Sequence, residues 1–132
     1  MIERLVPAAT SAVGLFLVLA AAVAALQNAP QPALVFGVLG LAHIGVAFGI
    51  ASGSRLAAGL GILVGTVTAA LVAAGIAFIV GIESGIGFDL NVAWFAPLNG
   101  YATIAVATAI LAASALLVVG GIRAIRRGTL TA

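Results

Sequence analysis

The chain has 132 residues, of which 64% are hydrophobic and only 6% are charged, and its net charge is +2. A soluble domain carries roughly a quarter charged residues, and a chain this poor in charge would aggregate in water. Composition therefore excludes an ordinary soluble domain and indicates one membrane domain. The chain has no cysteine, which excludes disulfides, thiolate metal sites and dithiol redox chemistry.

Four apolar segments are long enough to cross a bilayer. Backbone amides cannot stay unpaired in hydrocarbon, so long apolar runs there must be helical, and about 20 residues span its roughly 30 Å core. The predicted fold is an all-α, four-transmembrane-helix bundle within a single domain, residues 1–132. Its helices are expected at residues 8–26, 33–51, 56–82 and 101–122. The third is the longest, so it should tilt or project beyond the membrane.

The first segment has a second interpretation, as a cleavable signal peptide. Arg4 precedes its apolar run, and small residues follow at Ala22-Val23-Ala24. The run over 8–26 is longer than the usual signal-peptide core of about 7–15 residues. We therefore expect this segment to remain as a membrane helix.

The outer loop, residues 83–100, separates the third and fourth segments. Asp89 is a suitable helix N-cap, and a short interfacial helix is predicted after it, with Trp94 and Phe95 at headgroup depth. With Tyr101, these aromatic residues form an expected interfacial belt. Glu83 and Asp89 are interpreted as solvated loop charges, because two carboxylates on a Gly-rich loop are a poor cation cage.

The five arginines determine the expected orientation. With four spans, the N-terminus, the loop after the second helix and the C-terminus share one side, and every arginine falls there. The arginines are Arg4, Arg55, Arg123, Arg126 and Arg127. The positive-inside rule then places both termini in the cytoplasm, in a multi-pass protein of the cell (inner) membrane, with the last three arginines as interface anchors.

Small residues recur at every fourth position along the third segment, a small-xxx-small pattern that lets helices approach closely. This series contains Ala57, Gly61, Gly65, Ala69, Ala73, Ala77 and Gly81. Shorter series are Gly45, Gly49 and Gly53 in the second segment, and Ala105, Ala109 and Ala113 in the fourth. We expect these series to pack the bundle internally; the alternative is a docking face for another subunit.

Few polar side chains fall inside the predicted spans. His43, the single histidine, lies near the centre of the second, while Thr66, Thr68 and Thr108 lie near the middle of the third and fourth. If these helices pack together, the four residues form a midplane cluster with a neutral imidazole. We favour an interhelical hydrogen bond over a proton-relay, quinone or substrate contact. A lone His cannot ligate haem from both sides, and no metal site is predicted.

Several four-helix membrane families have diagnostic residues that this chain lacks. Small multidrug-resistance transporters need a glutamate in the first helix, and relatives of vitamin K epoxide reductase, thiol oxidases and tetraspanins need cysteines. Lipid-headgroup transferases need clustered aspartates. The chain is similar in architecture to short bacterial four-helix proteins with a tight basic turn such as Ser52-Gly53-Ser54-Arg55. That resemblance implies no activity.

The predicted function is a non-enzymatic accessory, assembly or stabilising subunit of a larger membrane complex, because no catalytic constellation is present. The alternative is a homo-oligomeric small transporter, channel or holin-like pore built around His43. The expected partners are membrane lipids and other membrane subunits or further copies of the chain, with no nucleic acid. No cofactor is predicted, and a lipid, quinone or pigment in a helix groove stays open.

Overall fold

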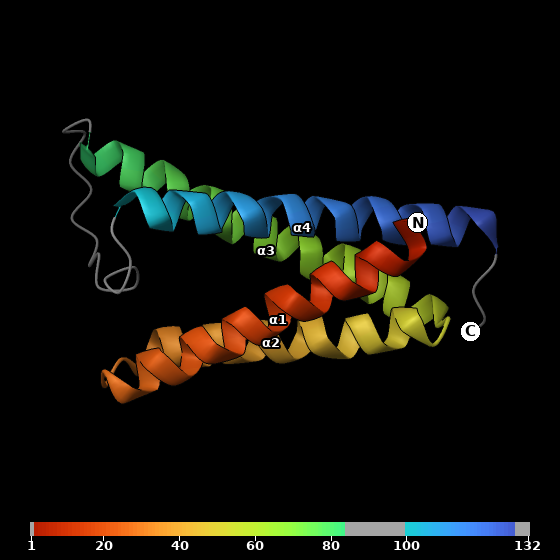
Figure 1. The fold of residues 1–132 in the computed structure, drawn as a ribbon, viewed down its shortest axis with the longest axis horizontal. Coiled ribbons are helices and arrows are strands. Elements are labelled where there is room, and N and C mark those ends of the chain that lie inside the picture. Colours follow the sequence, from red (N-terminus) through yellow and green to blue (C-terminus); the bar gives the residue numbers. More distant parts are fainter. Residues whose placement is uncertain (1, 84–99, 129–132) are drawn as a thin grey trace.

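The computed structural model describes residues 2–83 and 100–128, with side chains described for 4–77 and 105–128. Its described residues form an all-helical bundle, shown in Figure 1. The helices are α1 (Ile2–Leu26), α2 (Pro30–Ala51), α3 (Arg55–Glu83) and α4 (Gly100–Arg127). Each is long and apolar enough to cross a membrane. The prediction of four apolar helices is confirmed at this level.

α3 and α4 begin one residue earlier than expected, whereas α1 and α2 begin several residues earlier, and both of these larger differences involve proline. α1 begins at Ile2 and contains Pro7, and α2 begins at Pro30. Pro30 is at the first position of α2, where the N–H group would have no partner within the helix, so it costs little. Pro7 lies beyond the first turn of α1 and removes one internal hydrogen bond, a loss that helices in membranes tolerate. α4 also extends past Ile122 to Arg127, because arginine is a good helix former and a helix does not have to end where the apolar run ends.

The expected interfacial helix, with Asp89, Trp94 and Phe95, lies outside the described residues. The side chain of Tyr101 is also outside them, although its backbone belongs to α4.

Successive helices run in opposite directions, so the start of α1, the α2–α3 turn and the end of α4 share one end of the bundle (Figure 1). Close contacts establish this arrangement. A Cβ on Gly120 would lie 2.7 Å from a methyl of Val6, and a Cβ on Gly121 would lie 2.9 Å from the Ala58 carbonyl oxygen. The five arginines therefore gather at one end of the bundle, which we call the arginine end.

Two short turns reverse the chain within the described residues. Asn28, after α1, has a φ of +56°, and Gly53, after α2, has a φ of +81°. These are left-handed conformations that asparagine tolerates and glycine adopts freely. Ser54 then caps α3, since its hydroxyl oxygen accepts a hydrogen bond from the Ala57 N–H at 3.2 Å.

The bundle consists of two helical hairpins. α1 packs most extensively on α2, and α3 on α4, while the contacts between the hairpins are less extensive. One apolar cluster between the hairpins contains Val6, Val46 and Leu117. A second contains Val13, Leu17 and Ile110, with Phe36 packed against it. The core therefore draws on both hairpins.

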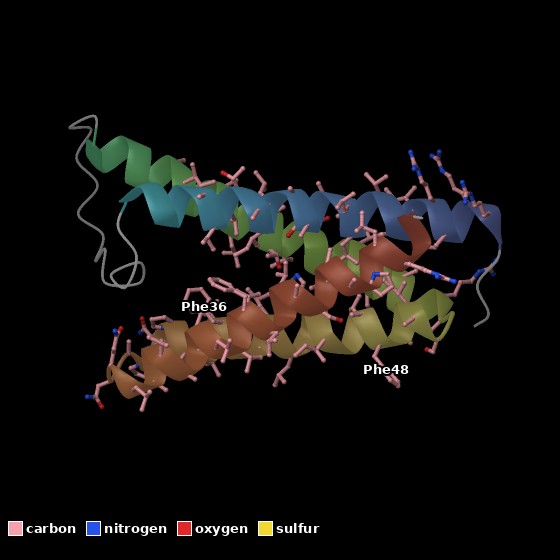
Figure 2. The ribbon with its side chains drawn as sticks, in the orientation of Figure 1. Phe36 and Phe48 are labelled. Carbon is pink, nitrogen blue, oxygen red and sulfur yellow. The ribbon has the colours of Figure 1, made fainter. Side chains whose placement is uncertain are left out.

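The outside of the bundle is apolar. Figure 2 shows Phe36 pointing into the space between the hairpins and Phe48 pointing away from the bundle. Phe48 is 78% exposed, and large apolar side chains are exposed on each of the four helices that the structure describes. A surface of this kind is stable against acyl chains, which agrees with four membrane-spanning helices.

Candidate functional site: a buried histidine between the hairpins

His43 and Thr68 form a polar pair where α2 meets α3. Both side chains are about 1% exposed. The His43 Nδ1 lies 2.7 Å from the Leu39 carbonyl oxygen, one helical turn earlier. The Nε2 lies 3.5 Å from the Thr68 hydroxyl oxygen. The pair therefore joins the two hairpins.

The hydrogen bonds determine which ring nitrogen of His43 carries the proton. A carbonyl oxygen only accepts, so Nδ1 must donate to Leu39. In the neutral ring, Nε2 is then the acceptor, and the Thr68 hydroxyl donates to it. That second bond is long, because O–H donors usually lie about 2.7–2.8 Å from their acceptors.

The Cβ of His43 lies close to the backbone of α1 at Gly14. A Cβ on Gly14 would lie 3.0 Å from the His43 Cβ and 2.9 Å from the Gly40 carbonyl oxygen. Because Gly14 and Gly40 have no side chains, α1 can approach α2 closely beside His43. This close crossing accompanies the burial of the His43 side chain, which is 1% exposed.

The other expected members of the midplane cluster lie elsewhere. Thr66 and Thr108 are both exposed on the outside of the bundle. The Thr66 hydroxyl donates to the Ile62 carbonyl oxygen of its own helix at 2.7 Å. Thr66 and Thr68 are two residues apart, which is about 200° around a helix, so they cannot both face the interior. Of the four residues in the predicted midplane cluster, the structure brings together only His43 and Thr68.

Two buried hydroxyls were absent from the predicted cluster. Thr10 of α1 and Ser114 of α4 are each about 1% exposed. Their hydroxyls donate to the carbonyl oxygens of Val6 and Ile110, four residues earlier, at 2.7 and 2.8 Å. The sequence signal was available, since each is a small polar residue on the inward apolar stripe of its helix.

The polar interior is internally satisfied. Every buried side-chain nitrogen or oxygen atom in the described part of the chain has a hydrogen-bond partner. The same residues contain no group of three or more His, Cys, Asp or Glu side chains that could hold a metal ion. This arrangement supports helix–helix association.

The small-residue series of α3 follows the packed face for only part of its length. Ala57, Gly61 and Gly65 are buried, whereas Ala73 and Ala77 are exposed. At about 100° per residue, every fourth position advances about 40°, so a long series rotates away from any one face. The packed face continues instead through Thr68.

The expected glycines of α2 are packed only in part. Gly45 is exposed and has no atom within 4 Å of a Cβ position, while Gly49 contacts Ala57 and Gly53 forms the turn. Gly40, which the every-fourth pattern omitted, is buried against Gly14.

The small residues of α4 are also divided between its two sides. Ala113 is half-buried, whereas Ala105 and Ala109 are exposed. Arg123, Arg126 and Arg127 are exposed at the arginine end, where the orientation argument expected interface anchors.

No protein-family model, curated protein or solved structure matches this chain. The arguments for function therefore rest on the geometry of the bundle.

Proposed function

We propose that this protein is a non-enzymatic subunit of a larger membrane complex, in which it assists assembly or stability. The observation that carries this proposal is the satisfied polar interior described above. Catalysts and carriers need groups positioned toward a substrate. The buried polar groups here already have partners inside the bundle, so the proposal assigns function to lateral contacts in the membrane.

The outward face of α3 has two different edges. The small edge contains exposed residues with short side chains, namely Gly59, Thr66, Ala70, Ala73 and Ala77. The large edge contains exposed leucines and a valine, namely Leu56, Leu60, Leu63, Val67 and Leu71. Small residues let two backbones approach in lipid, where the hydrophobic effect does not drive association. We place the partner helix on the small edge and acyl chains on the large edge.

Single-cysteine cross-linking tests this assignment. The chain has no cysteine of its own, so Ala73→Cys and Leu71→Cys each introduce one unique thiol. The two positions differ by about 3 Å in depth and by about 200° around the helix, and both are exposed. Ala73→Cys therefore probes the small edge and Leu71→Cys probes the large edge at a similar depth in the membrane.

In native membranes, a benzophenone photo-cross-linker attached to the introduced thiol should capture a partner several-fold more from Ala73→Cys than from Leu71→Cys. The mass of the product distinguishes a second copy of the chain from a different subunit. Equal capture from both positions, or migration solely as a monomer in native electrophoresis, would contradict the proposal.

We also propose that the arginine end faces the cytoplasm, in the inner membrane of the cell. All five positive side chains lie at that end, and positive charge is retained on the cytoplasmic side during insertion. Reporter fusions at the two termini test the orientation. Both reporters should give the cytoplasmic signal, and opposite signals would overturn the four-span arrangement.

The second candidate is a homo-oligomeric transporter, channel or holin-like pore. Its support is the position of His43 near the middle of α2, since ionisable residues at such depth often serve transport. This function needs a polar path past His43 and Thr68. Flux measured in vesicles should then fall strongly in His43→Leu, and unchanged flux in a folded variant would remove the support.

A further inference from the structure

The two hairpins are joined to each other at one end only. α1 and α2 form the first hairpin, α3 and α4 form the second, and the turn over residues 52–54 is the covalent link between them. This turn lies at the arginine end, where the Ser54 N–H donates to the Gly49 carbonyl oxygen at 2.9 Å. Figure 1 shows the hairpins converging at the arginine end and diverging toward the opposite end, which we call the far end. Covalent connection therefore restrains the hairpins relative to each other at the arginine end alone.

Near the arginine end, the hairpins approach each other closely through glycines. A Cβ on Gly120 of α4 would lie 2.7 Å from a methyl of Val6 in α1. A Cβ on Gly61 of α3 would lie 3.1 Å from a methyl of Val46 in α2. Val6 and Val46 form the first apolar cluster with Leu117, which is only 1% exposed. Helices that approach this closely gain many van der Waals contacts, which stabilise their association in lipid.

Farther from the arginine end, the hairpins meet mainly through large side chains. The second apolar cluster contains Val13, Leu17 and Ile110. The side chains packed against this cluster are all half-buried, namely Phe36, Leu39, Val72, Val106 and Ala113. Beyond the cluster, none of the described side chains over 69–77 of α3 and 105–109 of α4 is buried. The second cluster is therefore the last packed contact between the hairpins before the far end, among the residues whose side chains are described.

The membrane makes these two sets of contacts unequal in strength. No hydrophobic effect drives helices together in hydrocarbon, so association depends on how well they pack. Acyl chains can replace the contacts of half-buried side chains that already border lipid, whereas they cannot enter where backbones nearly touch. The His43–Thr68 pair lies at the boundary, because His43 is between Leu39 and Val46 along α2. Its Nε2 lies 3.5 Å from the Thr68 hydroxyl oxygen, which is a long and weak hydrogen bond.

We propose that the two hairpins pivot as rigid units about the arginine end, so that the second cluster opens and closes while the first cluster stays packed. The structure shows the closed position, in which Leu17 of α1 and Ile110 of α4 belong to one cluster. In the open position these side chains separate, and acyl chains cover the exposed faces of both hairpins. The turn over residues 52–54 is the hinge. This inference rests on the four-span arrangement and is independent of the proposed subunit function.

Distances between pairs of spin labels, measured by double electron–electron resonance in lipid nanodiscs, test the pivot. The chain has no cysteine, so labels attach only to introduced ones, and all five positions chosen here are exposed. Leu34→Cys with Ala105→Cys spans α2 and α4 toward the far end. Phe48→Cys with Ile122→Cys spans the same two helices near the arginine end. Leu5→Cys with Leu34→Cys lies within the first hairpin and is the control for its rigidity.

We expect the distance distribution of the far-end pair to be at least twice as wide as those of the other two pairs. Equal widths for the far-end and arginine-end pairs would overturn the inference. A control pair as wide as the far-end pair would also overturn it, because the first hairpin would then not move as a unit.

A substitution in the second cluster provides an independent measurement. Ile110→Ala shortens a buried side chain of that cluster, so it should shift the far-end distribution to longer distances and leave the arginine-end distribution unchanged. Leu116→Ala is the matched control on α4, because Leu116 is 36% exposed, and it should change neither distribution. An unchanged far-end distribution in Ile110→Ala, or equal shifts of both pairs, would contradict the pivot.

Discussion

Gly14 and Gly40 contact each other reciprocally where α1 crosses α2. A Cβ on Gly14 would lie 2.9 Å from the Gly40 carbonyl oxygen, and a Cβ on Gly40 would lie 2.9 Å from the Gly14 carbonyl oxygen. Both obstacles are backbone atoms, which cannot rotate away as a side chain can. The close crossing of α1 and α2 therefore requires glycine at both positions, since even the methyl group of alanine would collide with the opposite backbone.

Gly40→Ala should weaken the bundle. The added methyl group forces α1 and α2 apart, and overpacking of this kind costs about 1–3 kcal/mol. The measurement is the melting temperature or the midpoint of SDS-induced unfolding in mild detergent. Gly45→Ala is the control on the same helix, because Gly45 has nothing within 4 Å of its Cβ position. Similar destabilisation by both substitutions would contradict the crossing geometry.

The His43–Thr68 hydrogen bond should contribute little by itself. A double-mutant cycle with His43→Leu and Thr68→Val should give a coupling of about 1 kcal/mol or less, because membrane hydrogen bonds are weak on average and this one is long. Thr66→Val, on the outward face, should show no coupling to His43. A coupling of several kcal/mol would mean that the two side chains lie closer than 3.5 Å.

Leu117→Ala should destabilise the contact between the hairpins far more than Leu116→Ala. Leu117 is 1% exposed and packs in the cluster with Val6 and Val46, whereas Leu116 is 36% exposed. A buried Leu→Ala change costs about 2–5 kcal/mol in soluble proteins. Here we expect the lower part of that range. The unfolded helices remain in lipid or detergent, so the substitution loses van der Waals packing but little of the free energy of transfer from water. Unfolding midpoints in detergent provide the comparison.

Ser54→Ala should destabilise the start of α3 by about 1 kcal/mol, the usual cost of losing an N-cap. The lost interaction is the hydrogen bond from the Ala57 N–H to the Ser54 hydroxyl oxygen. Ser54→Asn should restore stability, because asparagine is an equally good N-cap. Amide hydrogen exchange at Ala57 reports the effect locally. Equal protection in all three proteins would show that the cap does not hold the helix.

The number of helices could be predicted from the sequence because hydrocarbon imposes one backbone solution on long apolar runs. Helix starts were harder to predict, since Pro7 and Pro30 both look like helix breakers. Pro30 is at the first position of α2, where proline is favoured, and Pro7 costs α1 one internal hydrogen bond without ending it. The pairing of His43 with Thr68 could be predicted, because both residues lie near the middle of their predicted spans and so at a similar depth in the membrane. Predicting that Thr66 faces outward would have needed the rotation of α3 about its own axis. Residue spacing does not specify this rotation when small residues occur on several faces of the helix.

The sequence pattern also could not predict which glycine of α2 makes the close contact with α1. Gly40 and Gly45 are chemically identical residues of one helix, yet one is buried against α1 and the other is exposed. Which glycine is buried depends on where a second helix crosses, a tertiary property. A search for spacing within one helix therefore found Gly45, Gly49 and Gly53 and missed the pair across two helices.

The arrangement as two hairpins has a consequence for biogenesis. Because α1 and α2 make their most extensive contacts with each other, the first half of the chain can complete its own interface before the second half leaves the ribosome. The tight turn at Gly53 then becomes the boundary between two successive insertion events. A gene cut at that turn encodes two fragments, each with the helix partner that it needs, and their reunion in the bilayer resembles the docking of two small subunits.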